Sequence, residues 1–224
     1  DISHKKTKTH LKVILLDLYL CWLEDEEKSL GVGMSNSFYN YRSRYNSLHL
    51  SNHMIAVVRR LHERGLIGLW KGSEWSGKTT RIWASESLVK AFQDAALNEF
   101  MVHTHEDKET IILRDMKKKP LEYRDKELPA AEAAKVTSMR QQLKEYNEAL
   151  FNTFIDIPTL EKGYIESLGS GRDDVRHSIS HHHKRVYRVF NNSSFYQGGR
   201  FYGGWWQNIP KRYRKDIFID DQST

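Results

Sequence analysis

The chain has 224 residues, 39% of them hydrophobic and 29% charged, and its 35 lysines and arginines against 29 aspartates and glutamates give a net charge of +6. This length and apolar content provide for one large domain or two with real cores, and the positive charge favours a polyanionic partner. The single cysteine, Cys21, excludes a disulfide framework, no apolar run is long enough for a membrane span, and the opening "DISHKKTKTH" lacks the apolar segment of a secretory signal. We therefore expect a cytoplasmic protein with no membrane partner.

The first predicted element is a helix over residues 11–27, "LKVILLDLYLCWLEDEE". It is apolar on most faces, which is typical of a helix at the centre of a small core. Cys21 lies within it and is expected to be a buried structural thiol.

Two further helices and a strand are predicted before residue 71. The segment 35–50, "SNSFYNYRSRYNSLHL", offers a helix that ends in a short turn around residues 47–49. The next helix begins after Ser51, a plausible N-cap, and stops at Gly65. Its apolar side chains recur at helical spacing: Met54, Ile55, Val58 and Leu61. A strand, "LIGLW", follows it.

Residues 72–80, "GSEWSGKTT", satisfy the phosphate-loop pattern G-x-x-x-x-G-K-[ST] letter for letter. In a nucleotide hydrolase, Lys78 would neutralise phosphate charge and Thr79 would ligate magnesium. That chemistry needs a helix directly after the loop. Here "TTRIWAS" is typical of a strand, and Ser85 is the expected N-cap of a later helix. We therefore interpret the stretch as the tip of a two-stranded hairpin and keep the nucleotide hydrolase as a remote alternative. The outward-facing cations of the hairpin would be Lys71, Lys78 and Arg81.

Three helices followed by a basic hairpin resemble the winged helix-turn-helix family over roughly residues 9–97, and "VVRRLHERGLI" before a Gly/Lys-rich loop is similar to that family's sequences. The resemblance implies that the third helix enters the major groove of DNA, where Asn and Arg pair with base edges, while the hairpin holds phosphates. The DNA-binding residues would be Ser51, Asn52, His53, Arg59, Arg60, Lys71, Lys78 and Arg81. Winged helices also serve as protein docking modules, so that alternative stays open.

A strand and a long helix are predicted after this first domain. "KETIILRD" (108–115) reads as a strand, and residues 116–127 read as a charged connector. Pro129 then opens a helix that extends to residue 154. Apolar side chains repeat along it at three-four spacing: Val136, Met139, Leu143, Tyr146 and Leu150. This stripe is expected to pack within the chain, with a partner-binding seam as the alternative.

Residues 157–184 are turn-rich and polar and contain four histidines: His177, His181, His182 and His183. Adjacent histidines can bind transition metals. No carboxylate or cysteine accompanies them at ligand spacing, however, and consecutive side chains on a strand point to opposite faces. We expect a basic, exposed linker without a metal site.

The C-terminal residues 185–220 interleave aromatic residues with glycines and basic residues. The aromatics are Phe195, Tyr196, Phe201, Tyr202, Trp205 and Trp206, and the glycines are Gly198, Gly199, Gly203 and Gly204. Such a surface is suited to stacking bases and holding phosphates, and glycines would let the backbone approach a ligand. An aromatic packing cluster in a Gly-rich turn accounts for the pattern equally well.

Within this stretch, "GGRFYGGWWQNIPKRYR" resembles the segment before the palm of family A DNA polymerases, where a Gly-Arg pair is followed by Gln-Asn-Ile-Pro and an arginine. The resemblance implies that these residues contact a primer–template duplex, whose minor-groove acceptors are shared by all base pairs. The contacting residues would be Arg200, Gln207, Asn208, Arg212 and Arg214. The interval from Arg200 to Gln207 is shorter than in the family, and Phe-Tyr-Gly-Gly-Trp-Trp replaces its small hydroxylated residues.

The catalytic parts of such a polymerase do not occur in this sequence. Nucleotidyl transfer needs two carboxylates that hold a pair of metal ions. The aspartates near the end lack the family's Asp-Tyr-Ser context and are interpreted as surface residues: Asp216, Asp220 and Asp221. We expect no catalytic residue, metal site or cofactor in this chain, with magnesium needed only if a palm domain follows Thr224. The start at Asp1 rather than Met and the abrupt end, "DDQST", suggest a fragment or a processed product.

These observations predict an α+β, mainly helical chain in three parts. Residues 1–100 would form a winged helix-turn-helix DNA-binding domain, 101–160 a strand plus a long amphipathic helix, and 161–224 an irregular, basic, Gly- and aromatic-rich segment. The predicted function is that of the DNA-binding portion of a phage- or plasmid-type replication protein, polymerase-like but not itself catalytic. An autonomous winged-helix transcription regulator or replication initiator is the alternative, and the oligomeric state is left open.

Overall fold

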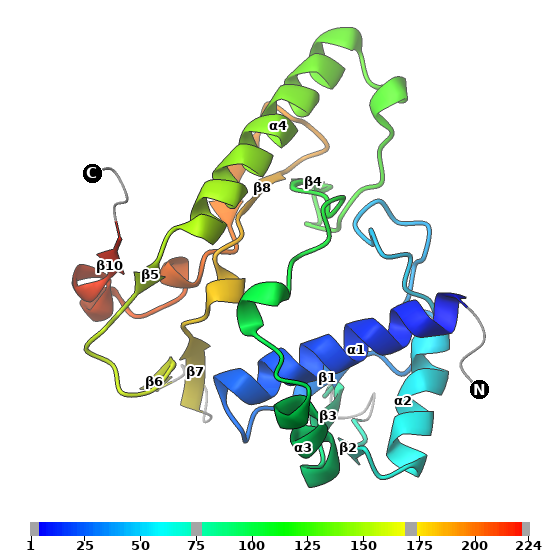
Figure 1. Cartoon of the computed structure of the whole chain (residues 1–224). Coiled ribbons are helices and arrows are strands. Elements are labelled where there is room, and N and C mark those ends of the chain that lie inside the picture. The colour runs from blue at the N-terminus through cyan, green and yellow to red at the C-terminus, as the bar shows by residue number, and fades with distance from the viewer. Residues whose placement is uncertain (1–4, 73–77, 169–173, 221–224) are drawn as a thin grey trace. The chain divides into compact units, whose positions relative to one another are not determined.

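The computed structural model describes residues 5–72, 78–168 and 174–220 and divides the chain into two compact units, Asp1–His105 and Glu106–Thr224. Helices and strands occur in both units (Figure 1), which confirms the predicted α+β class. Each unit has a buried apolar core of its own. In the described part of the chain, no helix combines the length and the apolar character needed to cross a membrane.

The first unit contains three helices: α1 (Lys5–Glu24), α2 (His53–Glu63) and α3 (Glu86–Asp94). The thiol of Cys21 in α1 is buried, as predicted. The chain leaves α2 at Gly65, whose φ of 68° lies in the left-handed region and whose N–H donates to the carbonyl of His62, so the predicted stop is confirmed. The predicted N-cap of α3 is also confirmed, because the Ser85 hydroxyl accepts the N–H of Leu88.

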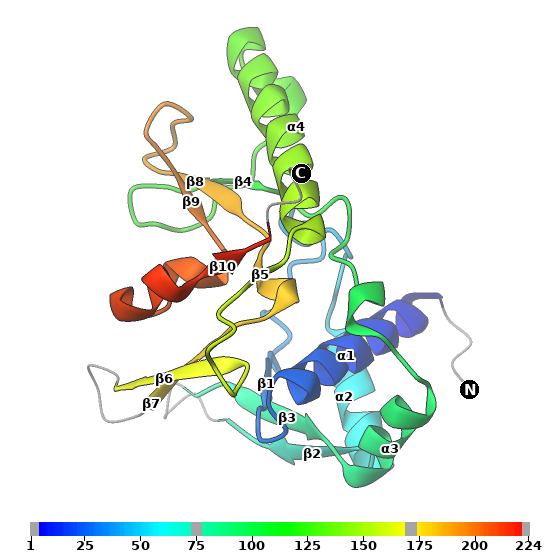
Figure 2. The same ribbon diagram turned by 60° about the vertical axis from the view of Figure 1, so that its left-hand side comes forward.

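A three-stranded antiparallel sheet completes the first unit, with β3 (Thr80–Ala84) between β1 (Leu30–Val32) and β2 (Ile67–Trp70) (Figures 1 and 2). The pairing of β2 with β3 confirms the predicted hairpin, whose tip, residues 73–77, lies outside the described residues. Inward-facing side chains of the sheet meet those of the helices in one core: Ile14, Leu18, Val32, Val58, Leu61, Ile67, Ile82, Leu88 and Phe92.

The helix predicted for residues 35–50 is absent, and that segment forms a series of turns. Its asparagine side chains bond to nearby backbone: the Asn46 amide oxygen accepts the N–H of Leu50 at 2.9 Å, and its amide nitrogen donates to the carbonyl of Asn40 at 3.0 Å. Such local bonds offer the backbone an alternative to the helix, which is why the prediction was wrong. The helix before α2 is therefore missing, and α2 packs on α1 instead.

In the second unit, β8 (Tyr187–Phe190) pairs in parallel with β4 (Ile111–Leu113) and antiparallel with β9 (Gly198–Tyr202). The long helix α4 (Ala130–Asn152) follows Pro129 as predicted and packs against one face of this sheet (Figure 2). Four residues of its predicted stripe are buried in that core: Val136, Met139, Leu143 and Leu150. The stripe therefore packs within the chain, although the fifth member, Tyr146, is half exposed.

Residues 157–184 do not form the predicted exposed linker. They contain an antiparallel pair of strands, β6 (Tyr164–Leu168) and β7 (Asp174–Ser178), in which Ile165 lies opposite His177 and is buried. The β-formers Tyr164 and Ile165 lie in this strand, and the polar composition of the surrounding stretch concealed it.

The C-terminal segment is likewise more regular than predicted, because β8 and β9 form a hairpin within it. Short 3-10 turns follow: Trp205–Gln207 and Lys211–Asp216. Two short strands, β5 (Ile155–Asp156) and β10 (Phe218–Ile219), pair antiparallel near them. A second small core joins these pieces through Ile157, Ile165, Trp205 and Ile209.

Candidate nucleic-acid interface

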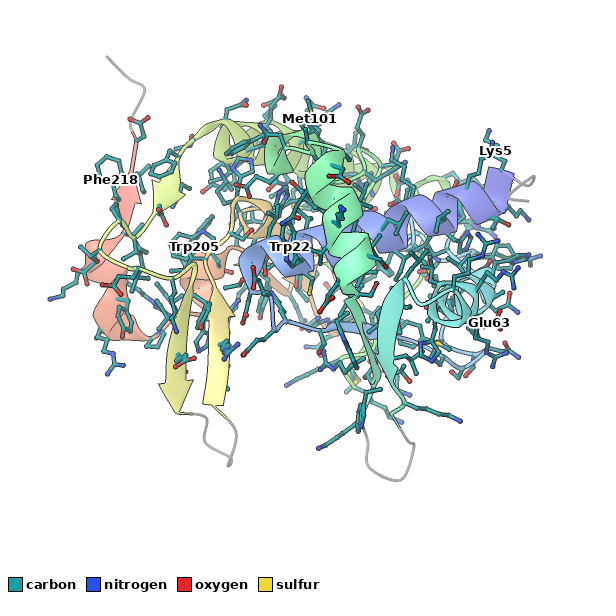
Figure 3. All side chains as sticks on the ribbon, turned by 60° about the horizontal axis from the view of Figure 1, so that its bottom comes forward. Lys5, Trp22, Glu63, Met101, Trp205 and Phe218 are labelled. Atoms are coloured by element: carbon teal, nitrogen blue, oxygen red, sulfur yellow. The ribbon has the colours of Figure 1, made fainter. Side chains whose placement is uncertain are left out.

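The solvent face of α2 carries the basic residues predicted to contact DNA. Asn52, Ala56, Arg59 and Glu63 follow one another at three- or four-residue spacing and are all exposed, so they form a single row. Arg60 lies beside this row and pairs with Glu63 at 3.2 Å. Both side chains of that pair are well exposed, so the pair contributes little to stability and either partner can be redirected to a ligand. Figure 3 shows side chains projecting outward around Glu63, at the end of α2.

Ser51 was predicted to cap α2 and to contact DNA; the structure contradicts the cap, and the DNA contact stays a prediction. The cap position is Asn52, without a side-chain cap bond. The Ser51 N–H donates to His10 Nε2 at 2.9 Å, and its hydroxyl lies 3.1 Å from His53 Nδ1. Because His10 Nδ1 faces the carbonyl of Lys6 at 2.7 Å, His10 is held as the Nδ1–H tautomer. Ser51 therefore anchors the start of α2 to α1 rather than capping the helix.

The hairpin presents its predicted cations outward, since Lys71, Lys78 and Arg81 are all exposed. The strand-and-helix order predicted after Lys78 is confirmed, because β3 follows directly and α3 begins only at Glu86. A phosphate loop would instead run into a helix at that point. The Thr80 hydroxyl accepts the N–H of Gly72 at 3.2 Å, which closes the two strands toward each other.

Sequence reasoning missed two tryptophans on the same hairpin. Trp70 and Trp83 are 47% and 42% exposed, the former opposite Arg81 and the latter opposite Gly68 in the sheet register. The signal was present in "IGLW" and "TRIWA", where both tryptophans occupy the outward positions of alternating strands.

In the second unit, Arg200 lies exposed on β9, opposite Val189 of β8. Tyr202, two residues further along β9, shares its face and stacks on Tyr187 with ring centroids 6.1 Å apart. Arg200 thus lies on an aromatic sheet face of the kind that contacts nucleic acid.

The Gln-Asn-Ile-Pro segment is held together by the polar residues predicted to bind primer–template. Gln207 donates from Nε2 to the carbonyl of Phe201 at 3.2 Å. Arg214 donates from Nη2 to the carbonyls of Gln207 and Ile209 at 3.1 and 3.4 Å. Gln207 and Arg214 therefore hold this turn in place, whereas Asn208 and Arg212 are exposed, the latter over the Tyr213 ring.

The glycines of this region serve the chain's own packing. A Cβ at Gly199 would lie 2.7 Å from Arg188 Nη2 and 2.8 Å from the Phe190 ring. At Gly203 it would collide with the carbonyl of Arg185. Packing within the chain therefore accounts for these two glycines, because residues of β8 and its N-terminal flank occupy the space that a Cβ would need.

The histidine-rich segment is partly buried rather than exposed. His181 and His182 are half-buried in a 3-10 turn, and His177 pairs with the Ser167 hydroxyl at 2.8 Å. The neighbouring Lys184 is buried, and its ammonium donates to the carbonyls of Phe151 and Thr153 at the end of α4. Over the described ranges, no group of three or more His, Cys, Asp or Glu side chains could hold a metal ion. Asp216 and Asp220 are exposed, and Asp221 lies outside those ranges.

A hollow of about 310 Å³ lies in the first unit between α1, β3 and α3. Trp22, labelled in Figure 3, and Trp83 line its apolar part. Its charged lining residues balance: Glu26, Lys28, Glu86 and Lys90. The hollow therefore carries no net charge that would select a phosphate.

A scan against protein-family models and searches of curated proteins and of solved structures find no match to this chain. The function of the chain is therefore inferred from the geometry of its two units.

Proposed function

We propose that this chain is the DNA-binding portion of a replication-type protein, in which the first unit binds duplex DNA as a winged helix and the second unit contacts primer–template. Binding, not nucleotidyl transfer, is the proposed activity of the residues described above.

The observation that carries the proposal is the exposed face of α2 that holds Arg59 and Arg60, followed in the chain by a hairpin with the exposed cations Lys71, Lys78 and Arg81. The chain order α1, β1, α2, β2, β3 and the sheet order β1-β3-β2 support the proposal of a winged helix, with turns where one of its helices would lie. Neither fold nor charge fixes a function alone, but a basic helix beside a basic hairpin offers both base-edge and phosphate contacts.

The α2 row suits a groove for a steric reason as well. Ala56, the residue between Asn52 and Arg59, projects only a methyl group, so the helix backbone can approach base edges. Asn52 and Arg59 then reach adenine and guanine edges, each good bidentate contact being worth about 1–3 kcal/mol of discrimination. Lys71 and Lys78 hold phosphates, which sets affinity and register but not sequence.

In the second unit, Arg200 and Arg212 are exposed cations of the polymerase-like segment. Arg200 shares its sheet face with the Tyr187–Tyr202 stack, and we propose that it contacts the primer–template backbone or minor groove. Gln207 and Arg214 support this contact by fixing the turn after β9.

The test is binding of the full chain to duplex and primer–template DNA across a salt series. We expect the variant Arg59→Ala/Arg60→Ala to bind duplex more weakly and to flatten the salt slope by about one unit for each phosphate that the variant no longer neutralises. Arg200→Ala is expected to weaken primer–template binding selectively. Arg124→Ala/Lys126→Ala, which also removes two exposed cations, is the charge-matched control for the α2 variant, and Arg124→Ala alone is the control for Arg200→Ala. If the double control weakens binding as much as the α2 variant, binding reflects net charge and the proposed site is wrong.

An autonomous winged-helix regulator or replication initiator is the second candidate. It is favoured by the aromatic residues Phe195 and Trp205, which the second unit buries in its own cores. Under this function Arg200→Ala leaves every DNA affinity unchanged, and the α2 row selects a defined duplex sequence.

A further inference from the structure

The outward face of the β1–β3–β2 sheet carries three flat side chains side by side: Trp70, Arg81 and Trp83. Trp70 and Arg81 lie directly opposite each other on β2 and β3, and Trp83 follows Arg81 on the same face of β3. All three are exposed, whereas the inward residues Ile67 and Ile82 are buried. We call these three residues the tryptophan platform.

Glycines beneath the platform let two of its members lie flat. Gly68 stands opposite Trp83, and a Cβ there would collide with the indole ring. Gly31 stands opposite Arg81, and a Cβ there would lie 3.3 Å from the Arg81 Nη1. Arg81 also reaches the carbonyl of Ser29 at 3.5 Å, so its guanidinium extends across β1. Trp83 and Arg81 therefore lie flat along the sheet, and both side chains remain exposed on the outward face.

Covering a glycine can by itself explain an aromatic residue on a sheet surface. That explanation applies to Trp83 but not to Trp70, which stands opposite an arginine and is the more exposed of the two. Two half-exposed indoles on one small sheet, with the Arg81 guanidinium over the neighbouring β1, offer planar surfaces that suit a ligand with planar groups.

We propose that the tryptophan platform binds the unpaired bases of a single-stranded nucleic acid. Stacking on aromatic rings needs bases that are free of a partner strand, and it tolerates any sequence because every base has a planar face. The charge of the hairpin fits the same ligand. Arg81 belongs to the platform, and two more exposed cations, Lys71 directly after β2 and Lys78 two residues before β3, lie close to it in the chain. An apolar peptide or a second copy of this surface would bring no negative charge to these cations.

The inference deepens the proposed DNA-binding function and rests on it. If α2 holds duplex, the platform gives the same unit a second, chemically distinct site for the adjoining single strand. The ligand class of the first unit is then a junction between single and double strands rather than duplex alone.

The experiment measures binding of the full chain to the twelve-nucleotide oligomers dT12 and rU12 and to a blunt duplex, by fluorescence anisotropy of labelled strands. We expect Trp70→Leu to weaken dT12 binding roughly 5- to 150-fold, the range that stacking of one base spans. Trp70→Phe is expected to restore much of the affinity, since it keeps a ring. Phe100→Leu, which removes a 53% exposed aromatic of the same unit outside the sheet, is the matched control and should leave binding unchanged. The oligomers together show whether the platform prefers DNA or RNA.

The possible results distinguish a failure of the tryptophan platform from a failure of the proposed duplex-binding function. If Trp70→Leu stays folded by circular dichroism and binds dT12 as wild type does, the platform is not a base-stacking site. The same conclusion follows if Trp70→Leu changes only the self-association seen by sedimentation, because the face then joins copies of the chain. Unchanged duplex binding in Arg59→Ala/Arg60→Ala would instead overturn the proposed duplex site while leaving a dT12 effect of Trp70 intact.

Discussion

Arg140 of α4 joins the helix to two other segments of the second unit, and its removal gives a sharp test of the fold. Its Nε donates to Glu109 at 3.0 Å, and its two terminal nitrogens donate to the Asp125 carboxylate at 2.8 and 3.1 Å. Burial alone would lower the pKa of the Arg140 guanidinium, but hydrogen bonds to Asp125 and Glu109 outweigh burial and raise it. The guanidinium therefore stays charged and holds both carboxylates.

The expected cost of Arg140→Met follows from the exposure of the two acids. The Glu109 side chain is 5% exposed, and removing one partner of a buried ion pair costs about 3–5 kcal/mol. Asp125, at 42% exposed, adds only about 0–1 kcal/mol. Glu109 keeps two backbone donors in the variant, the N–H groups of Thr110 and Ile111 at 2.9 and 2.8 Å. Because these donors still stabilise its charge, we expect Arg140→Met to lower the unfolding free energy by about 3 kcal/mol, the lower end of the range.

Native-state hydrogen exchange is the suitable assay, because a chain of two units need not unfold in one step. We expect protection of α4 to fall by about 3 kcal/mol in Arg140→Met, while α2, in the other unit, serves as the internal control. Adding Glu109→Gln should recover about 1–2 kcal/mol, since it removes the stranded charge. A decrease below about 0.5 kcal/mol in the single variant, or no recovery in the double variant, would refute the reasoning.

Two further predictions concern packing and the buried thiol. Gly199→Ala should cost about 2–4 kcal/mol of unfolding free energy, because φ is 74° and Cβ would crowd Arg188 and Phe190. Gly163→Ala should cost little, because its Cβ would make only an ordinary contact with the Ile179 carbonyl at 3.9 Å, and thermal denaturation compares the two variants. Burial raises the pKa of the Cys21 thiol. The contribution of the buried, protonated thiol to folding stability is therefore fully present below the pKa of the thiol in the unfolded chain, about 8.5. It is lost as pH rises through the higher pKa of the folded chain. Native chain should accordingly react with a maleimide at pH 8 far more slowly than urea-unfolded chain, and equal rates would contradict the buried position.

The helix ends that were predicted correctly are set by residues at or next to those ends. The Ser85 cap, the Gly65 stop and the Pro129 start each satisfy or remove particular backbone groups, so they act independently of distant contacts. The helix predicted for residues 35–50 is absent for a local reason as well, because the side chain of Asn46 bonds to a backbone group that a helix would use.

The candidate sites were predictable only in part. Exposed cations such as Arg59 and Lys71 could be read from helical and strand periodicity. The outward positions of Trp70 and Trp83 could be read in the same way. Their meeting with Arg81 in the tryptophan platform could not, because it depends on the register across strands, which the sequence alone does not specify. Gln207 and Arg214 were expected to meet a ligand, yet their donors reach backbone carbonyls brought close by a turn that composition does not reveal.

The parallel pairing of β4 with β8 also sets the order in which the second unit can form during synthesis. β4 and α4 leave the ribosome well before β8, yet Ile111 and Val136 are buried only in a core that also needs Phe190 and Phe195. The apolar stripe of α4 thus emerges without its cover, and closing so long a loop makes folding slow. During that interval the uncovered apolar stripe of α4 leaves the nascent second unit open to aggregation.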